Sequence, residues 1–136
     1  MSIKKKYIDS IYNLIKLVEE LRLKCPWDRE QTFDTLRNLT IEETFELSEA
    51  IILNDNEQIK NELGDILLHI IFYATIASEN EFFNLYDVSE SISNKLINRH
   101  PHVFDNKKIN NSDDLKRNWE EIKLKEGNKS VLSGVP

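Results

Sequence analysis

Glycine, proline and cysteine are scarce in this chain, whose 136 residues include three glycines, three prolines and one cysteine. So few glycines and prolines disfavour a sheet with many tight turns and favour long helices. The lone Cys25 excludes an intrachain disulfide, which fits a reducing compartment. Charged residues follow the basic stretch 4–6, so the N-terminal segment resembles neither a signal peptide nor a membrane span. Together these features predict a soluble, cytoplasmic protein.

Positive charge is also in deficit, because 24 acidic residues outweigh 18 basic ones and give a net charge of −6. That balance argues against broad binding to nucleic acid or to an anionic membrane. A small anionic substrate is compatible with it, because a metal ion and a local basic cluster can reverse the sign of the charge inside a cleft. The length and the ordinary apolar content predict one globular domain over residues 1–136, with a tail at 127–136.

Apolar residues recur at helical spacing through most of the chain, which predicts an all-α fold. The segment 57–78 is apolar almost all round after residue 66, so it is expected at the centre of a helical bundle. The five predicted helices cover residues 7–24, 40–53, 57–78, 85–98 and 112–126.

Local signals predict where these helices begin and end. Pro26 is expected to end the first helix at Cys25, leaving 25–28 as a loop. Thr32 or Asp34 can cap a short separate turn that reaches about Arg37. Thr40 is the predicted N-cap of the second helix, with Glu43 at the capping-box position. Ser112 or Asp113 is the predicted cap of the last helix, and Gly127 its end.

Two acidic pairs carry the strongest functional signal. Glu43 and Glu46 are three residues apart, and Glu62 and Asp65 repeat that spacing on the next helix, so each pair shares one helix face. The short connection at 54–56 makes the two helices antiparallel neighbours. Carboxylates that face each other repel and resist the loss of water, and a hard divalent cation is the simplest remedy.

The chemistry of these ligands narrows the choice of metal ion. All four side chains offer oxygen, which suits Mg²⁺, Mn²⁺ or Ca²⁺ rather than zinc. A di-iron bundle needs Glu-x-x-His pairs, and position 65 is Asp where His is required. Glu42 neighbours the cluster and is either a base for a bound water or a solvent-facing side chain.

Four further features lie outside the acidic pairs. His69 follows Asp65 by four residues, so it either reaches the site or is a hydrogen-bonded core histidine. Gly64 lies inside a helix, where a close approach by another helix or a ligand would justify it. Trp27 is either a plug over the core or an aromatic lip of a cleft. Lys95 and Arg99 share one helix face.

These motifs together resemble those of the MazG-type, all-α nucleoside triphosphate pyrophosphohydrolases. The resemblance rests on Glu-Glu-x-x-Glu at 42–46 followed by Glu-x-x-Asp at 62–65. It extends to Cys-Pro-Trp-Asp at 25–28, Arg-His-Pro-His-Val-Phe at 99–104 and Ser-Val-Leu-x-Gly-Val-Pro at 130–136. It implies a helical bundle of about five helices with a four-helix core and an active site between helices.

The resemblance also implies a Mg²⁺-dependent cut between the α and β phosphates of a nucleoside triphosphate, with Mn²⁺ as a substitute ion. The implied metal ligands are Glu43, Glu46, Glu62 and Asp65. The side chains implied to neutralise phosphates are Lys95, Arg99 and Lys123, which fits the phosphate chemistry of Lys and Arg. Trp119 would contact the nucleoside, since an indole offers a base-tolerant π face. The family is typically a homodimer or a tetramer.

Three alternatives stay open on the sequence alone. One is specificity for dUTP/dCTP or for phosphoribosyl-ATP within the same fold. Another is a catalytically weak regulatory domain, because many relatives carry two such domains and this chain carries one. The third is a non-enzymatic helical module whose acidic face binds a basic partner.

Overall fold

The computed structural model describes residues 2–105 and 111–134, with side chains in the second range as far as residue 127. The described residues form helices and no strand, which confirms the all-α class. In chain order the helices are α1 (Ile3–Lys24), α2 (Pro26–Arg29), α3 (Phe33–Ile52), α4 (Asn56–Glu79), α5 (Leu85–Arg99), α6 (Pro101–Phe104) and α7 (Ser112–Gly134). A search of the described helices for a membrane-crossing segment finds none that is long and apolar enough.

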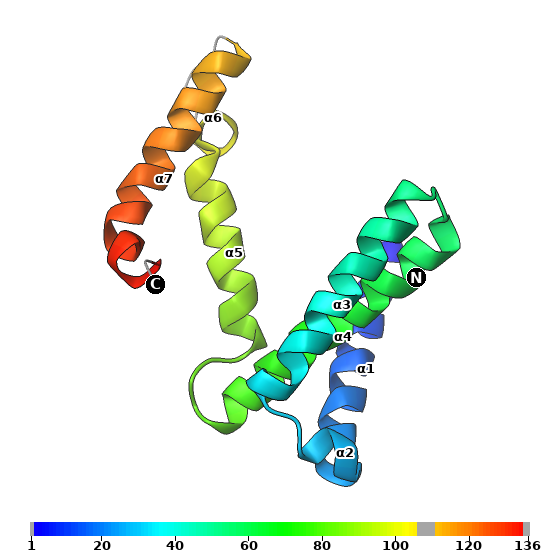
Figure 1. Cartoon of the computed structure of the whole chain (residues 1–136). Coiled ribbons are helices and arrows are strands. Elements are labelled where there is room, and N and C mark those ends of the chain that lie inside the picture. Colours follow the sequence, from blue (N-terminus) through cyan, green and yellow to red (C-terminus); the bar gives the residue numbers. More distant parts are fainter. Residues whose placement is uncertain (1, 106–110, 135–136) are drawn as a thin grey trace. The chain divides into compact units, whose positions relative to one another are not determined.

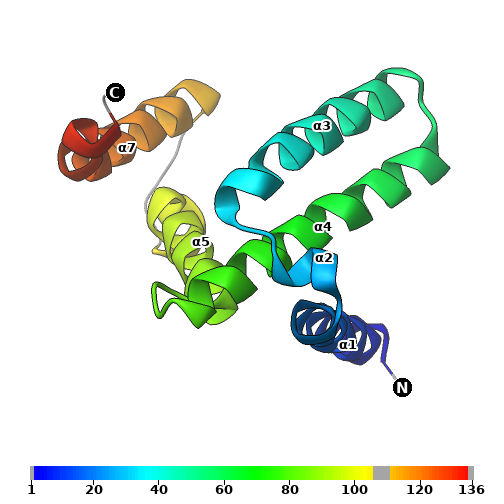
Figure 2. The same cartoon turned by 60° about the horizontal axis from the view of Figure 1, so that its bottom comes forward.

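The first of two compact units spans Met1–Leu85, and the antiparallel pair α3 and α4 dominates it (Figures 1 and 2). α1 packs on α4, and the buried core formed by α1, α3 and α4 consists of Val18, Leu36, Ile71, Phe72 and Ile76. The connection from α3 to α4 is short because Asn54 adopts a left-handed φ of 55° and Asp55 caps α4 through Gln58 N. This hairpin brings the two acidic pairs onto neighbouring helices.

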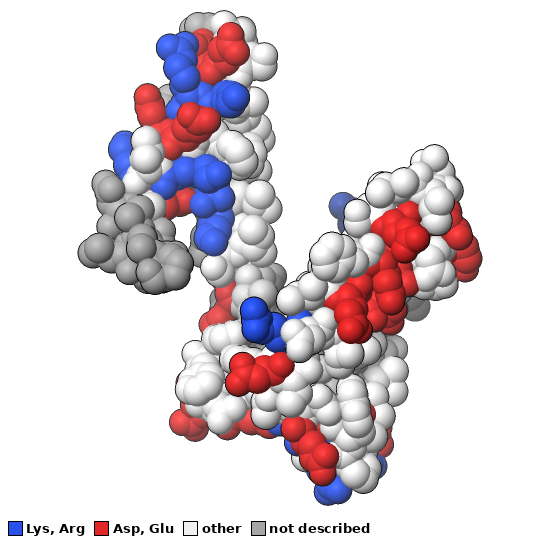
Figure 3. All heavy atoms as spheres, viewed as in Figure 1, with Lys and Arg blue, Asp and Glu red and all other residues white. Residues whose placement is uncertain are grey.

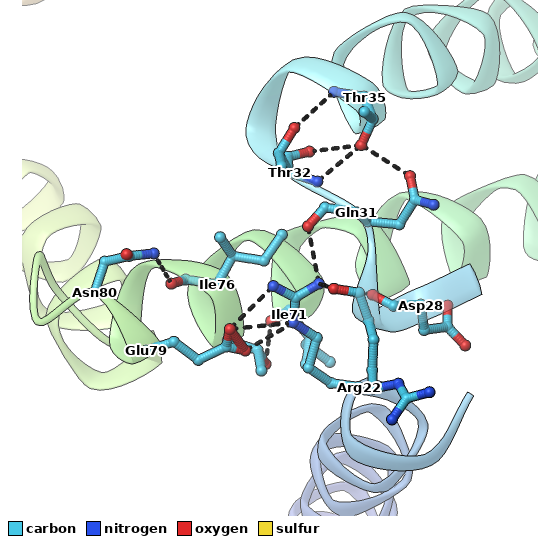
Figure 4. Close-up of polar contacts among 11 residues, drawn as sticks. Arg22, Asp28, Gln31, Thr32, Thr35, Ile71, Ile76, Glu79 and Asn80 are labelled. Carbon is cyan, nitrogen blue, oxygen red and sulfur yellow. Dashed lines mark hydrogen bonds and ion pairs between the residues drawn. The ribbon is translucent and has the colours of Figure 1, made fainter. Parts of the chain in front are cut away.

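The start of α3 differs from the prediction. The hydroxyl of Thr32 accepts from Thr35 N, and Thr35 in turn accepts from Thr32 N, so this capping box begins the helix at Phe33 (Figure 4). The capping role predicted for Thr32 is confirmed. The N-cap predicted at Thr40 is wrong, and so are the separate turn before it and the capping-box role of Glu43. Thr40 lies within α3, where its hydroxyl contacts Leu36 O at 3.1 Å.

The segment 25–28 is a short helix rather than the predicted loop. Pro26 occupies the first helical position of α2, where its missing N–H costs nothing. Arg22 holds this segment by donating to the carbonyls of Asp28 and Gln31 at 2.7 and 2.8 Å, and its guanidinium also pairs with Glu79 on α4 (Figure 4). One arginine thus joins α1, α2 and α4.

The second compact unit spans Tyr86–Pro136 and contains α5, α6 and α7. Arg99 on α5 pairs with Glu126 on α7 at 2.7 Å, and Asn98 donates to the same carboxylate at 2.9 Å. Asn111, not Ser112 or Asp113, caps α7, because its side-chain oxygen accepts from Asp114 N at 2.8 Å. α7 continues past Gly127 to Gly134, so the end predicted at Gly127 is wrong. Residues 135–136 of the predicted tail lie outside the described residues.

Candidate metal centre

Three of the predicted acidic residues meet in the α3–α4 hairpin. Glu43 comes from α3, while Glu62 and Asp65 come from α4, and one carboxylate oxygen of each lies within 4.8 Å of the other two. Glu62 is only 3% exposed. Figure 3 shows acidic side chains gathered along the α3–α4 hairpin. The i, i+3 spacing therefore does place carboxylates from two helices at one point.

Protonation relieves the repulsion within this cluster. Hydrogen bonding to Glu62, burial, and the charges of Asp65 and Glu46 raise the pKa of Glu43 to about 8. The same contact with Glu43 lowers the pKa of Glu62. The contact between the two carboxyl groups thus favours the protonated form of Glu43. A cation could take the place of that proton.

The cluster has the features of a cation site. Oε2 of Glu43 and Oε2 of Glu62 are buried, and neither has a hydrogen-bond partner in the described part of the chain. Buried carboxylate oxygens without partners are costly unless a proton or a cation satisfies them. Gln58 donates to the other oxygen of Glu62, which fixes the orientation of that carboxylate. Carboxylate oxygens held on rigid helices suit a hard divalent ion.

Glu46 and Glu42 lie beside this cluster rather than in it. Glu46 is exposed, and the charge of Glu62 is the main cause that raises its pKa, with a smaller contribution from Glu42. Glu42 is also exposed on α3. The roles of Glu46 as a fourth ligand and of Glu42 as a base stay predictions.

The predicted nucleotide-binding residues lie partly in each unit. Trp27 is exposed on α2. In the second unit, Lys95 is exposed on α5, and Arg99 is paired with Glu126. Lys123 lies 4.6 Å from the centroid of the Trp119 ring, a cation–π contact within α7. Their roles toward a nucleotide stay predictions.

The contacts of His69 favour the second predicted alternative, a histidine that is hydrogen-bonded within the packing of α3 on α4. Its Nδ1 lies 2.8 Å from the hydroxyl of Thr40, which also lies 2.5 Å from the hydroxyl of Tyr73. Burial lowers the pKa of His69, while the charge of Asp65 raises it to a smaller extent. A Cβ added at Gly64 would meet no described atom within 4 Å, so a close approach by another helix does not explain this glycine.

Sequence reasoning missed Thr40, Tyr73 and Gln58 at this site. Gln58 could have been found, because it precedes Glu62 by four residues on the same helix. Thr40 and Tyr73 meet only through the packing of α3 on α4, which no local spacing reveals.

A helical hairpin that gathers buried carboxylates between its two helices defines a class: all-α proteins with a candidate divalent-cation centre. The sequence profile of the MazG nucleotide pyrophosphohydrolase domain matches residues 31–104, a range that contains the whole acidic cluster. The chain belongs to this MazG family.

Its relatives fit that assignment. The chain is 38% identical over 133 residues to a nucleoside triphosphate pyrophosphohydrolase of Escherichia coli K12, covering 95% of this chain and 51% of that protein. It is 40% identical over 124 residues to the nucleoside triphosphate pyrophosphohydrolase/pyrophosphatase MazG of Thermotoga maritima, covering 90% and 47%. It therefore spans about half the length of these relatives.

A solved structure resembles this fold as well. The crystal structure of a mazG-related protein from Thermotoga maritima superposes with a TM-score of 0.72 at 26% identity. The match covers 83% of this chain and 98% of that one.

Proposed function

We propose that this protein is a Mg²⁺-dependent nucleoside triphosphate pyrophosphohydrolase that releases a nucleoside monophosphate and pyrophosphate. The observation that carries the proposal is the carboxylate cluster of Glu43, Glu62 and Asp65, in which Oε2 of Glu43 and Oε2 of Glu62 are buried without a partner among the described residues. The family and the printed names of its relatives supply the substrate class.

Different acidic residues of the chain would bind the metal and accept the proton. Glu43, Glu62 and Asp65, with Glu46 beside them, would hold Mg²⁺, or Mn²⁺ in its place. The bound ion supplies neutralisation of phosphate charge and acidifies a water molecule. The carboxylate of Glu42 would accept a proton from the attacking water. Water adds to one of the two phosphorus atoms, and the α–β bridging oxygen leaves with the other phosphoryl group.

The other predicted side chains would bind the nucleotide. Lys95, Arg99 and Lys123 would neutralise phosphate oxygens, while Trp119 and Trp27 would contact the nucleoside. Arg99 is paired with the Glu126 carboxylate, so a phosphate oxygen would have to replace or share that partner. We further propose a cytoplasmic homodimer as the working form.

A nucleotide panel tests the proposal directly. Canonical ribo- and deoxynucleoside triphosphates, dUTP, dCTP and phosphoribosyl-ATP are incubated with and without Mg²⁺, and pyrophosphate and orthophosphate are measured separately. We expect pyrophosphate only with the metal. Preference for dUTP/dCTP or phosphoribosyl-ATP would assign the narrower specificity within the fold.

Variants connect that activity to the cluster. Glu62→Gln and Asp65→Asn should each reduce kcat more than about 100-fold, because they remove metal ligands. Glu57→Gln is the control, since Glu57 lies on the same helix but pairs with Lys60 in solvent. Undiminished turnover in both ligand variants would refute the assigned site. An absence of turnover with every nucleotide would instead favour a regulatory or interaction domain.

A further inference from the structure

The polar contacts of Thr40, one helical turn away from the acidic cluster, carry an inference about nucleotide recognition. Three groups surround its single hydroxyl: Leu36 O at 3.1 Å, His69 Nδ1 at 2.8 Å and Tyr73 OH at 2.5 Å. A threonine hydroxyl has one proton to donate and two lone pairs to accept with. The three contacts must share these sites.

Only one arrangement of protons makes all three contacts hydrogen bonds. Leu36 O is a carbonyl and can only accept, so the Thr40 proton must point to it. Tyr73 then donates its hydroxyl proton to Thr40. His69 must likewise donate, which places its proton on Nδ1. A neutral histidine in that tautomer carries its free lone pair on Nε2.

Partial burial of this ring favours its neutral form and one kind of partner. His69 is partly buried, and burial lowers its pKa. It follows Asp65 by four residues on α4, so both side chains belong to the same helix face. A neutral ring with its proton on Nδ1 can accept a hydrogen bond at Nε2 but cannot donate one there. It is therefore unsuited to phosphate oxygens and suited to an O–H or N–H donor.

We propose that Thr40 locks His69 in the Nδ1–H tautomer, so that His69 Nε2 accepts a hydrogen bond from the nucleoside part of the substrate. The inference rests on the proposed function for the identity of the ligand, while the tautomer itself does not. His69 is then a specificity-determining residue. The donor is a sugar hydroxyl or an N–H group of the base, both of which share this chemistry.

The ¹⁵N chemical shifts of the imidazole rings test the tautomer in the whole, metal-free protein. The chain has three histidines, and the spectrum of His69→Gln identifies the signals of His69. We expect a protonated Nδ1 and an unprotonated Nε2. Thr40→Val should abolish that preference, and Tyr73→Phe should keep it, because Thr40 still accepts from His69. An Nε2–H tautomer in the wild-type protein overturns the proposal, even if Thr40→Val fails to fold.

Ligand titrations test the contact. A nucleoside triphosphate analogue with a methylene group between the α and β phosphates should shift the Nε2 signal with Mg²⁺, whereas Mg²⁺-pyrophosphate should not. A weaker response to the 2′-deoxy or the 2′,3′-dideoxy analogue identifies a sugar donor, and an equal response to both identifies a base donor. An equal shift with pyrophosphate, or no shift at saturation, overturns the contact.

Affinities provide a second measure of the contact. His69→Leu should weaken binding of the analogue about five- to tenfold and leave pyrophosphate affinity unchanged, because one hydrogen bond is lost. His69→Gln, which retains an acceptor, should recover part of that affinity. A loss that affects pyrophosphate equally contradicts the proposal. None of these measurements needs turnover, so their outcome is separable from that of the hydrolysis assay.

Discussion

At the scale of single residues, the proton shared between Glu43 and Glu62 is the main electrostatic feature of the protein. The pKa of Glu43 is about 8 in the folded chain, against an ordinary value of 4.5. The folded protein therefore retains a proton that the unfolded chain has already released. A divalent cation competes with that proton, since it needs the ionised carboxylate. Metal binding and pH are thus linked through one side chain.

This linkage predicts how stability varies with pH in the metal-free protein. Because the pKa of Glu43 is raised on folding, its contribution to the free energy of unfolding falls as pH rises from about 4.5 to about 8. Glu43→Gln, which stays neutral, should lack this loss. Urea denaturation of both proteins in EDTA between pH 5 and 8 measures the difference. Parallel pH profiles would contradict the assignment.

The effect of Mg²⁺ on the melting temperature gives a second test of the role of Glu43. At pH 8 Mg²⁺ should raise the melting temperature of the wild-type protein, because it binds the folded state and not the unfolded one. The rise should be smaller at pH 6, where the proton competes. Glu43→Gln should lose most of the rise at both values, and Glu57→Gln should keep it.

At the scale of elements, Arg22 is the side chain that secures α2 between α1 and α4. Its side chain is 14% exposed and meets the carbonyls of Asp28 and Gln31 together with the Glu79 carboxylate. Arg22→Met keeps the apolar stem and removes all these bonds, so it should lower the free energy of unfolding by about 2–4 kcal/mol. Lys24→Met, at an exposed ion pair with Glu20, is the control and should leave the free energy of unfolding almost unchanged. Similar losses measured by urea denaturation would refute the anchoring role.

The α5–α7 contact gives a prediction for the second unit. Hydrogen bonds from Asn98 and Arg99 lower the pKa of Glu126. Since the lowered pKa belongs to an acid, its contribution to stability is present above the ordinary value and is lost as pH falls. Glu126→Gln should therefore speed amide exchange in α7 at neutral pH, and the difference should shrink in acid. Glu120→Gln, exposed on the same helix, should leave exchange unchanged; equal rates in both variants would contradict the prediction.

The helix interiors could be predicted from the sequence, whereas several helix ends could not. Apolar periodicity located the bodies of α1, α4 and α5 because it reports the helical repeat, but it did not predict burial, since no residue of α5 is buried. Pro26 and Gly127 led to wrong predictions at two positions, a loop at 25–28 and a helix end at 127. Proline also begins helices, and glycine is tolerated inside them. The start of α3 depended on a choice between two threonines, Thr32 and Thr40, which local signals leave open.

The acidic pairs were predictable for a related reason. Helical spacing alone puts Glu62 and Asp65 on one face, and the short connection supplies the facing helix. Which oxygens become buried depends on packing, so the separation of Glu43 from Glu46 in the cluster could not be read from spacing. The Thr40–His69 contact likewise needed the three-dimensional arrangement of α3 and α4.

At the scale of the whole molecule, one apolar stripe on α3 lacks a partner within the described residues. It consists of Ile41, Phe45 and Ile52, which share a helix face beside the acidic cluster. Phe45 is 72% exposed and Ile52 is 74% exposed. Contiguous exposed apolar side chains of this kind mark interaction surfaces. The predicted homodimer offers a partner for the stripe, since a second copy brings the same apolar surface.

The stripe predicts the oligomeric state and its dependence on single residues. Sedimentation velocity of the wild-type chain should show a dimer, because covering the stripe removes apolar area from water. The double variant Phe45→Ser/Ile52→Ser should shift the equilibrium toward monomer, with far-UV circular dichroism unchanged. Leu124→Ser, a substitution of the same type at an exposed position on α7, is the matched control. If both variants stay dimeric, a different surface joins the copies; if Leu124→Ser alone dissociates the dimer, that surface includes α7.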